Sequence, residues 1–418
     1  AAGISNAFLA GDLFNLYVGF EMLLTASYVL LTLGGTEARV RAGVTYVIMS
    51  LLSSLLFLGA IGLVYGATGT VNLAHLAEVL PTVPAETQLL LHVSLLVAFG
   101  IKAAVFPLAF WLPDSYPTAP APVAAVFAGL LTKVGVYAII RTETLLFPGG
   151  ELRQVFMVVA LLTLLLGILG AVAQADLKRL LSFTLVSHIG YMVFGIALGS
   201  VAGLAGAVFY VVHHITIQTA LFLTCGLVDR RGGTTSLRRL GGLAQLSPVL
   251  GVLFFLPAMN LAGIPPFSGF VGKLSLFRAG TEAGGWMAYT LIGAGALTSL
   301  LTLYAVGRVW NLAFWRSADE ADDPEPELLI VRADTTSQQA HSQPAPTPSR
   351  TLMPPVMVGA TTVMAAVGVA LAVVAGPLWG VSTRAAEDLR ARTPYVSAVL
   401  PDGVPAPLAP EAGEGVGR

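Results

Sequence analysis

Long apolar runs separated by short polar turns occupy almost the whole chain. About 17 to 25 apolar residues are enough for one helix to cross the hydrocarbon core of a bilayer. Runs of this kind predict spans at 12–34, 41–66, 88–113, 119–141, 154–174, 179–199, 203–228, 247–278, 286–315 and 352–380. Residues 1–9 are predicted to be the end of a further helix, and 72–80 a small amphipathic helix. The pattern therefore predicts an all-α integral membrane protein, a polytopic bundle of about ten full spans.

Two of these runs contain residues that break a helix. Proline lacks the backbone N–H and clashes with the preceding turn, so the run 88–113 is predicted to break at Pro107. The run 247–278 is predicted to break at Gly263, Pro265 and Pro266. Backbone groups freed at membrane depth are tolerated only where protein or a water-filled cavity satisfies them. Two interrupted helices at corresponding places therefore indicate an internal repeat and a transport path.

The two breaks also suggest how the chain is divided. Each break is followed by one more span and then by a polar segment, so two five-helix units of like order are expected. Residues 317–350 are acidic and then rich in Pro, Ser, Thr and Gln, which is typical of an exposed linker. The predicted regions are a first unit at 1–141, a loop at 142–153, a second unit at 154–316, the linker at 317–350, a C-terminal transmembrane helix at 351–381 and a largely unstructured tail at 382–418.

The basic residues of the turns predict the orientation. Most of them fall on one side of the predicted bundle, among them Arg39, Arg41, Lys178 and Arg179. Because cytoplasmic loops carry an excess of Lys and Arg, this side is predicted to be cytoplasmic. The linker is then cytoplasmic and the tail external.

Composition and motifs exclude several classes of function. Only 11% of the residues are charged, against about 25% in soluble proteins, and the net charge of −1 offers no basic surface for nucleic acid. A single cysteine, Cys225, excludes a disulfide framework. No transition-metal ligand spacing, phosphate loop or nucleophile elbow occurs, so neither a metal, a cofactor nor an enzymatic activity is expected. The opening "AAGISNAFLAGD" has no Met and no positively charged n-region, so no signal peptide is visible.

Three of the four lysines lie inside predicted spans, at Lys102, Lys133 and Lys273. The arginines fall in loops, tails or near span ends. A charged residue at the centre of a transmembrane helix costs roughly 2.5–3.5 kcal/mol. Arginine keeps its proton in almost any protein setting, whereas a desolvated lysine can release it. We therefore interpret the three lysines as proton carriers. The alternative is that each reaches to the membrane interface or forms a static buried pair.

One carboxylate and several histidines complete the candidate relay. Glu21 is the only carboxylate well inside a predicted span and is the expected partner of Lys102. Imidazoles titrate near neutral pH and suit proton transfer, which makes His188, His213 and His214 candidates; each could instead be a buried neutral histidine satisfied by a hydroxyl. His92, at the start of its span, is expected at the membrane interface.

Several long strings carry a specific resemblance to a known family. They are "GDLFNLYVGFEMLLTASYVLLTLGG", "PLAFWLPDSYPTAPAPVAAVFAGLLTKVGVYAIIR", "SHIGYM", "HHITIQTALFLTCG" and "GIPPFSGFVGK". Together they resemble the proton-conducting antiporter-like subunits shared by Mrp sodium/proton antiporters and respiratory complex I, and the first two are most similar to the D subunits of the Mrp antiporters. The resemblance implies a fold with two inverted five-helix repeats, each with a discontinuous helix. It also implies that this sequence begins near the end of the family's fourth helix.

The resemblance assigns roles to individual residues. It implies that Glu21 and Lys102 form a carboxylate–lysine pair, that Lys133 is a central relay and that Lys273 ends the second half. His214 corresponds to a histidine of the family's eleventh helix. Many members carry a lysine where this chain has Gln218, so a water or His214 would have to bridge that position.

These observations favour a proton-translocating subunit of a multisubunit sodium/proton antiporter in a bacterial cell membrane. Other subunits, protons, sodium and the lipid bilayer are then its partners. The closest alternative is a proton-pumping membrane subunit of a complex I-like or hydrogenase-linked oxidoreductase. A membrane transferase or a purely structural scaffold would leave the three intramembrane lysines unexplained.

Overall fold

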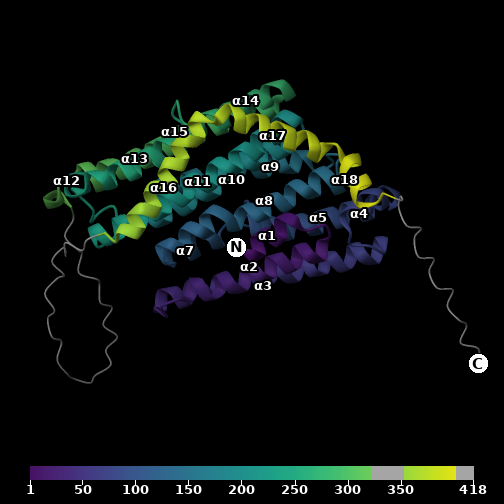
Figure 1. Ribbon diagram of the computed structural model, residues 1–418, viewed down its shortest axis with the longest axis horizontal. Helices are drawn as coiled ribbons and strands as arrows, with labels where there is room; N and C mark the ends of the chain where they lie inside the picture. Colours follow the sequence, from purple (N-terminus) through teal and green to yellow (C-terminus); the bar gives the residue numbers. More distant parts are fainter. Residues whose placement is uncertain (322–352, 402–418) are drawn as a thin grey trace, which may run out of the picture.

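The computed structural model describes residues 1–321 and 353–401, where the chain forms a bundle of long helices lying side by side (Figure 1). Nine helices of the described part are long and apolar enough to cross a membrane. They are Leu13–Thr32, Arg39–Thr68, Ala85–Ala103, Ala121–Leu146, Arg153–Ala173, Leu177–Leu198, Val201–Gly232, Trp286–Trp315 and Pro355–Val373. The predicted span 247–278 is not among them because its break divides it into two helices that are each too short.

The helices of the first half are α1 (Ala2–Leu9), α2 (Leu13–Thr32), α3 (Glu37–Thr68), α4 (Leu73–Val79), α5 (Ala85–Ala103), α6 (Trp111–Ser115), α7 (Ala121–Val126) and α8 (Thr132–Arg141). Four short turns join them: the 3-10 turns η1 (Leu80–Thr82) and η2 (Tyr116–Thr118), and the π turns η3 (Phe127–Leu131) and η4 (Thr142–Leu146). The last span of this half runs without interruption through α7, η3, α8 and η4. The prediction of a loop from residue 142 is therefore wrong as far as Leu146, because an apolar segment follows the polar residues 142–144.

The second half and the C-terminal part contain α9 (Arg153–Ala173), α10 (Leu177–Leu198), α11 (Val201–Gly232), α12 (Leu243–Leu246), α13 (Pro248–Ala262), α14 (Ser268–Ala283), α15 (Trp286–Val309), α16 (Pro355–Val373), α17 (Ala375–Arg390) and α18 (Arg392–Val399). The π turn η5 (Trp310–Trp315) continues α15, and the 3-10 turn η6 (Ala318–Glu320) follows it. In this half α10 packs between α9 and α11. Most of α10 is buried, as expected for a helix at the centre of the bundle.

The second helix of each half begins in the same way. Asp12 caps α2 by accepting a hydrogen bond from the Asn15 N–H at 2.6 Å, and Asp176 caps α10 by accepting one from the Arg179 N–H at 3.0 Å. A carboxylate at this position satisfies a free N–H and interacts well with the positive end of the helix. The same local solution therefore occurs once in each half.

The same two aspartates each form one isolated antiparallel bridge, to Asn72 in the first half and to Ser236 in the second. The number of residues between the bridged positions is the same in both halves. When the two bridged pairs are aligned with each other, α3 of the first half corresponds to α11 of the second, and Ser54 corresponds to Gln218. The match supports two units of like order; their inverted arrangement and their limits at 1–141 and 154–316 stay predictions.

The first predicted break is confirmed. Helix α5 ends at Ala103, and Ala104 has a left-handed backbone with φ of +56°. Pro107 lies in the irregular stretch that follows. The N–H of Phe106, freed by the break, donates to the Thr163 hydroxyl of α9 at 3.0 Å. A side chain from the second half thus satisfies the backbone of the first.

The second predicted break is confirmed as well. Gly263 ends α13 with φ of +85°, and Pro265 and Pro266 lie between α13 and α14. Asn260 spans the gap, because its Oδ1 accepts the Gly269 N–H at 2.9 Å. Buried backbone groups must find such partners, and here one amide side chain supplies it.

Two ends of the bundle can be distinguished by their contacts. At one end Arg39 donates to the Thr118 carbonyl at 3.1 Å, and Arg179 donates to the Asp114 carboxylate at 2.8 Å. We call this the basic end. The opposite end carries α4 and α18, which pack against each other and lie together at one edge of Figure 1.

The C-terminal helices run the length of the bundle. The start of α16 contacts α11 near its C-terminus, where Met357 lies beside Gly226. Helix α17 packs along α11 towards the α4 end. The prediction of an unstructured tail is therefore wrong for residues 382–399, since Ser382 and Ala386 are buried on one face of α17. Residues 322–350 of the predicted linker, 351–352 of the predicted C-terminal helix and 402–418 of the tail lie outside the described residues.

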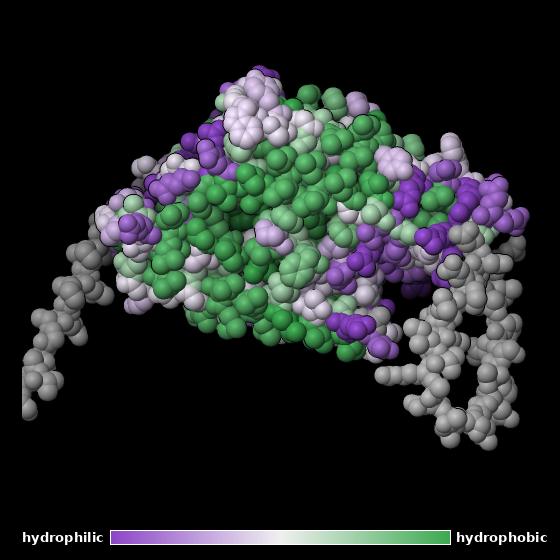
Figure 2. Space-filling model, turned by 180° about the vertical axis from the view of Figure 1, so that it is seen from behind, coloured by the Kyte–Doolittle hydropathy of each residue, from purple (hydrophilic) through white to green (hydrophobic). Residues whose placement is uncertain are grey.

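The outside of the bundle is suited to lipid. Figure 2 shows a broad hydrophobic face with hydrophilic residues towards both ends. Large apolar side chains of α3 are exposed on its outer side, among them Ile48, Leu55 and Leu63. Exposed apolar area of this extent is rare on a soluble monomer. The described part is therefore a multi-pass membrane protein.

Candidate functional site

Lys102 is held in the last turn of α5, directly before the first break. Its side chain is almost fully buried, with 9% of the residue exposed. The ammonium group donates to the Ser50 carbonyl at 3.3 Å and to the Ser54 hydroxyl at 3.2 Å, both from α3. A positive charge at this position also interacts favourably with the negative end of the helix. Lys102 thus lies buried within the candidate membrane span Ala85–Ala103.

Glu21 meets Lys102 through a third side chain. The Ser54 hydroxyl donates a short hydrogen bond to Oε1 of Glu21 and accepts one from Lys102. The ion pairs found among the described residues do not include Glu21 with Lys102. The expected direct pair is therefore replaced by a relay of carboxylate, hydroxyl and ammonium. Ser54 was missed from sequence because serine is common on helices and carries no signal of its own.

Lys133 owes its hydrogen bond to a local change of helix type. The π turn η3 widens the helix directly before α8, and the Lys133 ammonium donates to the Ala128 carbonyl at 2.6 Å. Lys133 is fully buried. Turns of this type occur often at functional sites. Close approach of α5 and α8 at Gly135, where a Cβ would lie 2.5 Å from the Ala103 nitrogen, brings the helices of the two lysines together.

A cluster of buried imidazoles and phenols occupies the centre of the second half. His188 Nδ1 lies 2.8 Å from the Tyr210 hydroxyl, and its Nε2 lies 3.3 Å from the Thr302 hydroxyl. The His188 ring stacks on His214 with ring centres 5.4 Å apart. Helices α10, α11 and α15 therefore all contribute to this histidine cluster.

His213 and His214 have different surroundings although they are adjacent in α11. His213 Nδ1 lies 2.9 Å from the Ser268 hydroxyl at the start of α14, which ties it to the second break. Neither ring nitrogen of His214 has a hydrogen-bond partner among the described residues. His214 lies on α11, which packs against α7 and η3 of the first half and against α14 of the second. Its position therefore joins the two halves of the molecule.

Gln218 stands one turn after His214 and is fully buried. Its Nε2 donates to the Leu181 carbonyl of α10 at 2.7 Å, and its Oε1 has no partner within the described chain. A buried acceptor left in this state is uncommon in folded proteins. The position thus keeps a free acceptor near His214 where a lysine was expected from the resemblance.

Lys273 reaches back across the second break. It lies in α14, and its ammonium donates to the carbonyls of Leu261 and Ala262 at the end of α13, at 2.8 and 2.9 Å. The ammonium also lies 5.2 Å from the centre of the Tyr191 ring. Its charge is held by helix-end carbonyls and an aromatic face.

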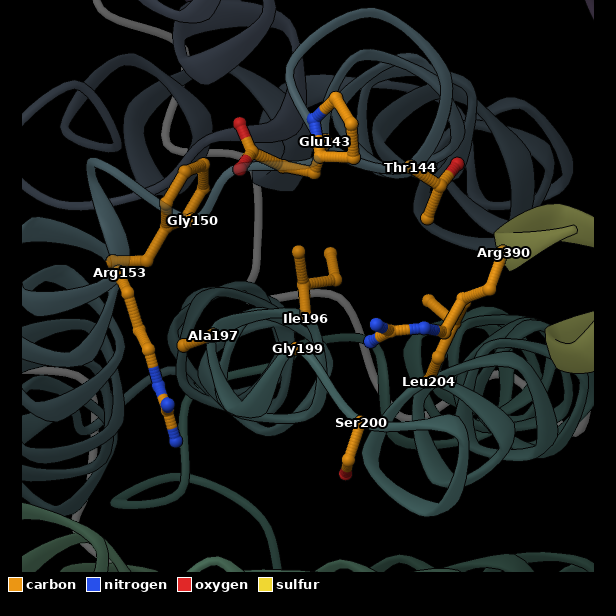
Figure 3. Close-up of a pocket in the computed structure, with 12 residues that line it drawn as sticks. Glu143, Thr144, Gly150, Arg153, Ile196, Ala197, Gly199, Ser200, Leu204 and Arg390 are labelled. Carbon is orange, nitrogen blue, oxygen red and sulfur yellow. The ribbon is translucent and has the colours of Figure 1, made fainter. Parts of the chain in front are cut away.

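A second ionisable pair was missed in the sequence. His92, expected at the interface, is fully buried, and its Nε2 lies 2.5 Å from Oε1 of Glu143. The pair lies at the α4 end, next to a cavity of about 90 Å³ that is lined in part by Arg153 and Arg390. Figure 3 shows the Arg390 side chain reaching into this cavity from α17 and the Arg153 side chain pointing away from it. Glu143 was overlooked because the span was predicted to end before it.

Other kinds of site find no support in the part of the chain that the structure describes. Residues 1–321 and 353–401 contain no group of three or more His, Cys, Asp or Glu side chains that could hold a metal ion. Cys225 is free and buried. The ionisable groups of the candidate relay are instead distributed over both halves: Glu21, Lys102 and Lys133 in the first, and His214 and Lys273 in the second.

Comparison with protein families identifies the fold. A model described as NADH:quinone oxidoreductase/Mrp antiporter, transmembrane, matches residues 10–302. The chain belongs to this family. The match includes every residue of the candidate relay, so the family resemblance and the observed geometry concern the same part of the molecule.

Individual members of the family are closely similar. The chain is 44% identical over 317 residues to the D subunit of the Na(+)/H(+) antiporter of Alkalihalophilus pseudofirmus, which covers 75% of this chain and 64% of the relative. It is 42% identical over 329 residues to the corresponding antiporter protein of Bacillus subtilis, covering 78% and 66%. The chain thus spans slightly less than two thirds of the length of these curated relatives.

A solved structure has the same fold over nearly the whole chain. The Mrp complex from Dietzia sp. DQ12-45-1b contains a chain that superposes with a TM-score of 0.82 at 34% sequence identity. The superposition covers 95% of this chain and 78% of that one. The similarity in fold therefore extends beyond the residues matched by the family model.

Proposed function

We propose that this chain is the proton-translocating subunit of a multisubunit sodium/proton antiporter in a bacterial cell membrane. The observation that carries the proposal is the presence of buried lysines and histidines in both halves of the bundle, with Lys102 joined to Glu21 through Ser54. The relatives named as D subunits of Na(+)/H(+) antiporters favour an antiporter over a redox-linked pump. The chain is then a transporter subunit and not itself an enzyme.

The relay works because each lysine can hold or release one proton. Glu21 stabilises the ammonium form of Lys102 through Ser54, and a change in that contact alters how firmly Lys102 keeps its proton. Lys133 receives the proton, and His214 passes it towards the histidine cluster and Lys273. Imidazole suits the middle position because it can accept a proton at one ring nitrogen and donate from the other.

Other subunits complete the exchange. Proton movement through this chain drives sodium exit by electrostatic coupling to neighbouring subunits of an Mrp-type complex.

The orientation proposed from the basic turns places the basic end in the cytoplasm. Arg316 donates to the Leu240 carbonyl just before the linker, and α18 lies at the α4 end, which supports a cytoplasmic linker and an external tail.

The experiment that tests the proposal is sodium-dependent proton exchange in inside-out vesicles that hold the assembled complex. Lys102→Ala and Glu21→Ala are each expected to abolish exchange without loss of assembly, because the first ammonium of the relay or its counter-charge is removed. Assembly is checked by co-purification of the other subunits. Full exchange by either assembled variant would contradict the proposal.

A further inference from the structure

Asn260, the buried amide that spans the second break, is also bonded to the C-terminal helix α16. Its Nδ2 donates to the Gly368 carbonyl of α16 at 3.1 Å, and its Oδ1 accepts the Gly269 N–H of α14 at 2.9 Å. A carbonyl oxygen can only accept a hydrogen bond, and a backbone N–H can only donate one. These two contacts therefore fix which way the amide points, and they turn its oxygen towards the start of α14.

Ser268, the first residue of α14, lies between this oxygen and a histidine. Its hydroxyl lies 3.2 Å from Oδ1 of Asn260 and 2.9 Å from Nδ1 of His213. All three residues are at most 1% exposed. The amide oxygen has no proton to give, so the hydroxyl donates its single proton to Oδ1. The serine oxygen is then left as an acceptor, and Nδ1 of His213 must supply the proton of the bond between them.

The second ring nitrogen of His213 agrees with this assignment. Nε2 is buried and has no hydrogen-bond partner among residues 1–321 and 353–401. A proton on Nε2 would bury an N–H donor, or with Nδ1 also protonated a full positive charge, that nothing in the described chain accepts. The neutral ring with its proton on Nδ1 avoids this cost, and its Nε2 carries a free lone pair.

The free lone pair lies against α14. A Cβ on Gly269 would lie 3.1 Å from Nε2 of His213, so a glycine at this position lets the edge of the ring approach the helix backbone. Lys273 follows four residues later and lies on the same face of α14. The nitrogen that can accept a proton is thus beside the helix that carries one lysine of the proposed relay.

We propose that Asn260 is a positioning residue that, through Ser268, keeps the proton of neutral His213 on Nδ1 and leaves Nε2 free to accept another. His213 takes up one proton at Nε2, becomes an imidazolium and releases that proton from Nε2 again, while the Nδ1 proton remains in its bond to Ser268. His213 therefore holds a proton for the relay without passing it across the ring. This inference rests on the proposed function, because it assigns a proton of that relay to one nitrogen.

Nitrogen NMR of the assembled complex tests the assignment, because a protonated ring nitrogen and a bare one give separate signals. The complex is labelled with histidine that carries an NMR-active nitrogen isotope, and the His213 signals are identified as those missing from His213→Asn. At neutral pH, the expected spectrum shows Nδ1 protonated and Nε2 bare. A proton on Nε2, alone or together with one on Nδ1, would overturn the proposal.

Two variants test the positioning role. Ser268→Ala removes the hydroxyl and leaves the bond between Asn260 and the Gly269 N–H in place. Exchange per assembled complex should fall roughly tenfold, the rate equivalent of about one lost hydrogen bond. Asn260→Leu removes Oδ1 and frees the Ser268 hydroxyl to donate to Nδ1, so the proton of His213 should move to Nε2 in the same spectra. A purely structural role would not move this proton.

Ser182→Ala is the matched control, because the Ser182 hydroxyl is equally buried but donates to the Lys178 carbonyl at 2.9 Å. This variant is expected to keep its exchange rate and its His213 signals. Equal exchange by the assembled Ser182 and Ser268 variants would overturn the positioning role and leave the proposed function standing. Retained exchange in assembled Lys102→Ala would instead overturn the proposed function, while the NMR signals would still report the proton of His213.

Discussion

The lysine of the first broken helix precedes its break, whereas the lysine of the second follows it. Lys102 finds a hydroxyl and, through it, the carboxylate of Glu21. Lys273 finds two carbonyls at the end of α13. Both ammonium groups thus lie at the negative end of a half-helix, but only the first is linked by hydrogen bonds to a counter-carboxylate in the described chain. In the proposed relay, Glu21 could therefore change how firmly Lys102 holds its proton, whereas Lys273 is surrounded by backbone dipoles.

The two breaks also differ in the space that surrounds one glycine beside each of them. At the second break a Cβ on Gly269 would lie 2.0 Å from the Asn260 carbonyl oxygen, which is backbone and cannot move aside. At the first, a Cβ on Gly100 would meet only the Leu108 and Val105 side chains, at 3.3 Å. A methyl group therefore fits at Gly100 but not at Gly269, although backbone atoms are also in close contact at Gly135, beside the first break.

The largest expected effect is on stability, when each of these two glycines is replaced by alanine. Gly269→Ala should destabilise the protein by about 3 kcal/mol, because backbone atoms must separate. Gly100→Ala should change stability by no more than about 1 kcal/mol, since side chains can shift and alanine favours the helix. The midpoint of thermal denaturation in detergent measures both. Equal losses of stability in the two variants would mean that Gly100 and Gly269 do not differ in the space available to a Cβ atom.

A smaller effect is expected at the hydroxyl that joins Glu21 to Lys102. Ser54→Ala should slow exchange about tenfold, because a hydrogen bond from a neutral hydroxyl to a charged group is worth roughly 1.5–3 kcal/mol. Ser53→Ala is the matched control, since the Ser53 hydroxyl is equally buried but donates to the Ala98 carbonyl at 2.9 Å. Identical rates in both serine variants would mean that Glu21 acts on Lys102 without this bridge.

The coarse plan of the molecule could be predicted from sequence, because its signals are strong ones. Apolar runs predict spans, and Pro107 and Pro265 predict breaks since proline cannot continue a helix. Lys133 stood out because a basic residue in an apolar run is rare. Each of these residues departs from its local pattern.

What could not be predicted depends on tertiary contacts. Ser54 and Asn260 resemble ordinary helical residues until the helices are packed together. The π turn before Lys133 has no composition that marks it. The order in residues 382–399 comes from packing of α17 along α11 and of α18 against α4, and neither contact can be read from the sequence of the tail. His92 and Glu143 lie far apart in sequence and meet only when α5 packs beside η4.

Replacement of the intramembrane lysines by arginine tests whether they carry protons, because arginine keeps the positive charge but does not release its proton. The measurement is exchange by assembled complexes carrying Lys102→Arg, Lys133→Arg or Lys273→Arg. The control is Lys178→Arg, which alters a lysine that pairs with Asp229 at 2.7 Å outside the relay.

We expect each of the three buried variants to lose exchange about 100-fold, as when a proton-transfer group is removed. Lys178→Arg should remain within about twofold of wild type, because arginine can also pair with Asp229 and this partly exposed ion pair lies outside the proposed relay. Exchange near the wild-type rate in the three assembled variants would show that the lysines supply only fixed charge, and would contradict the account.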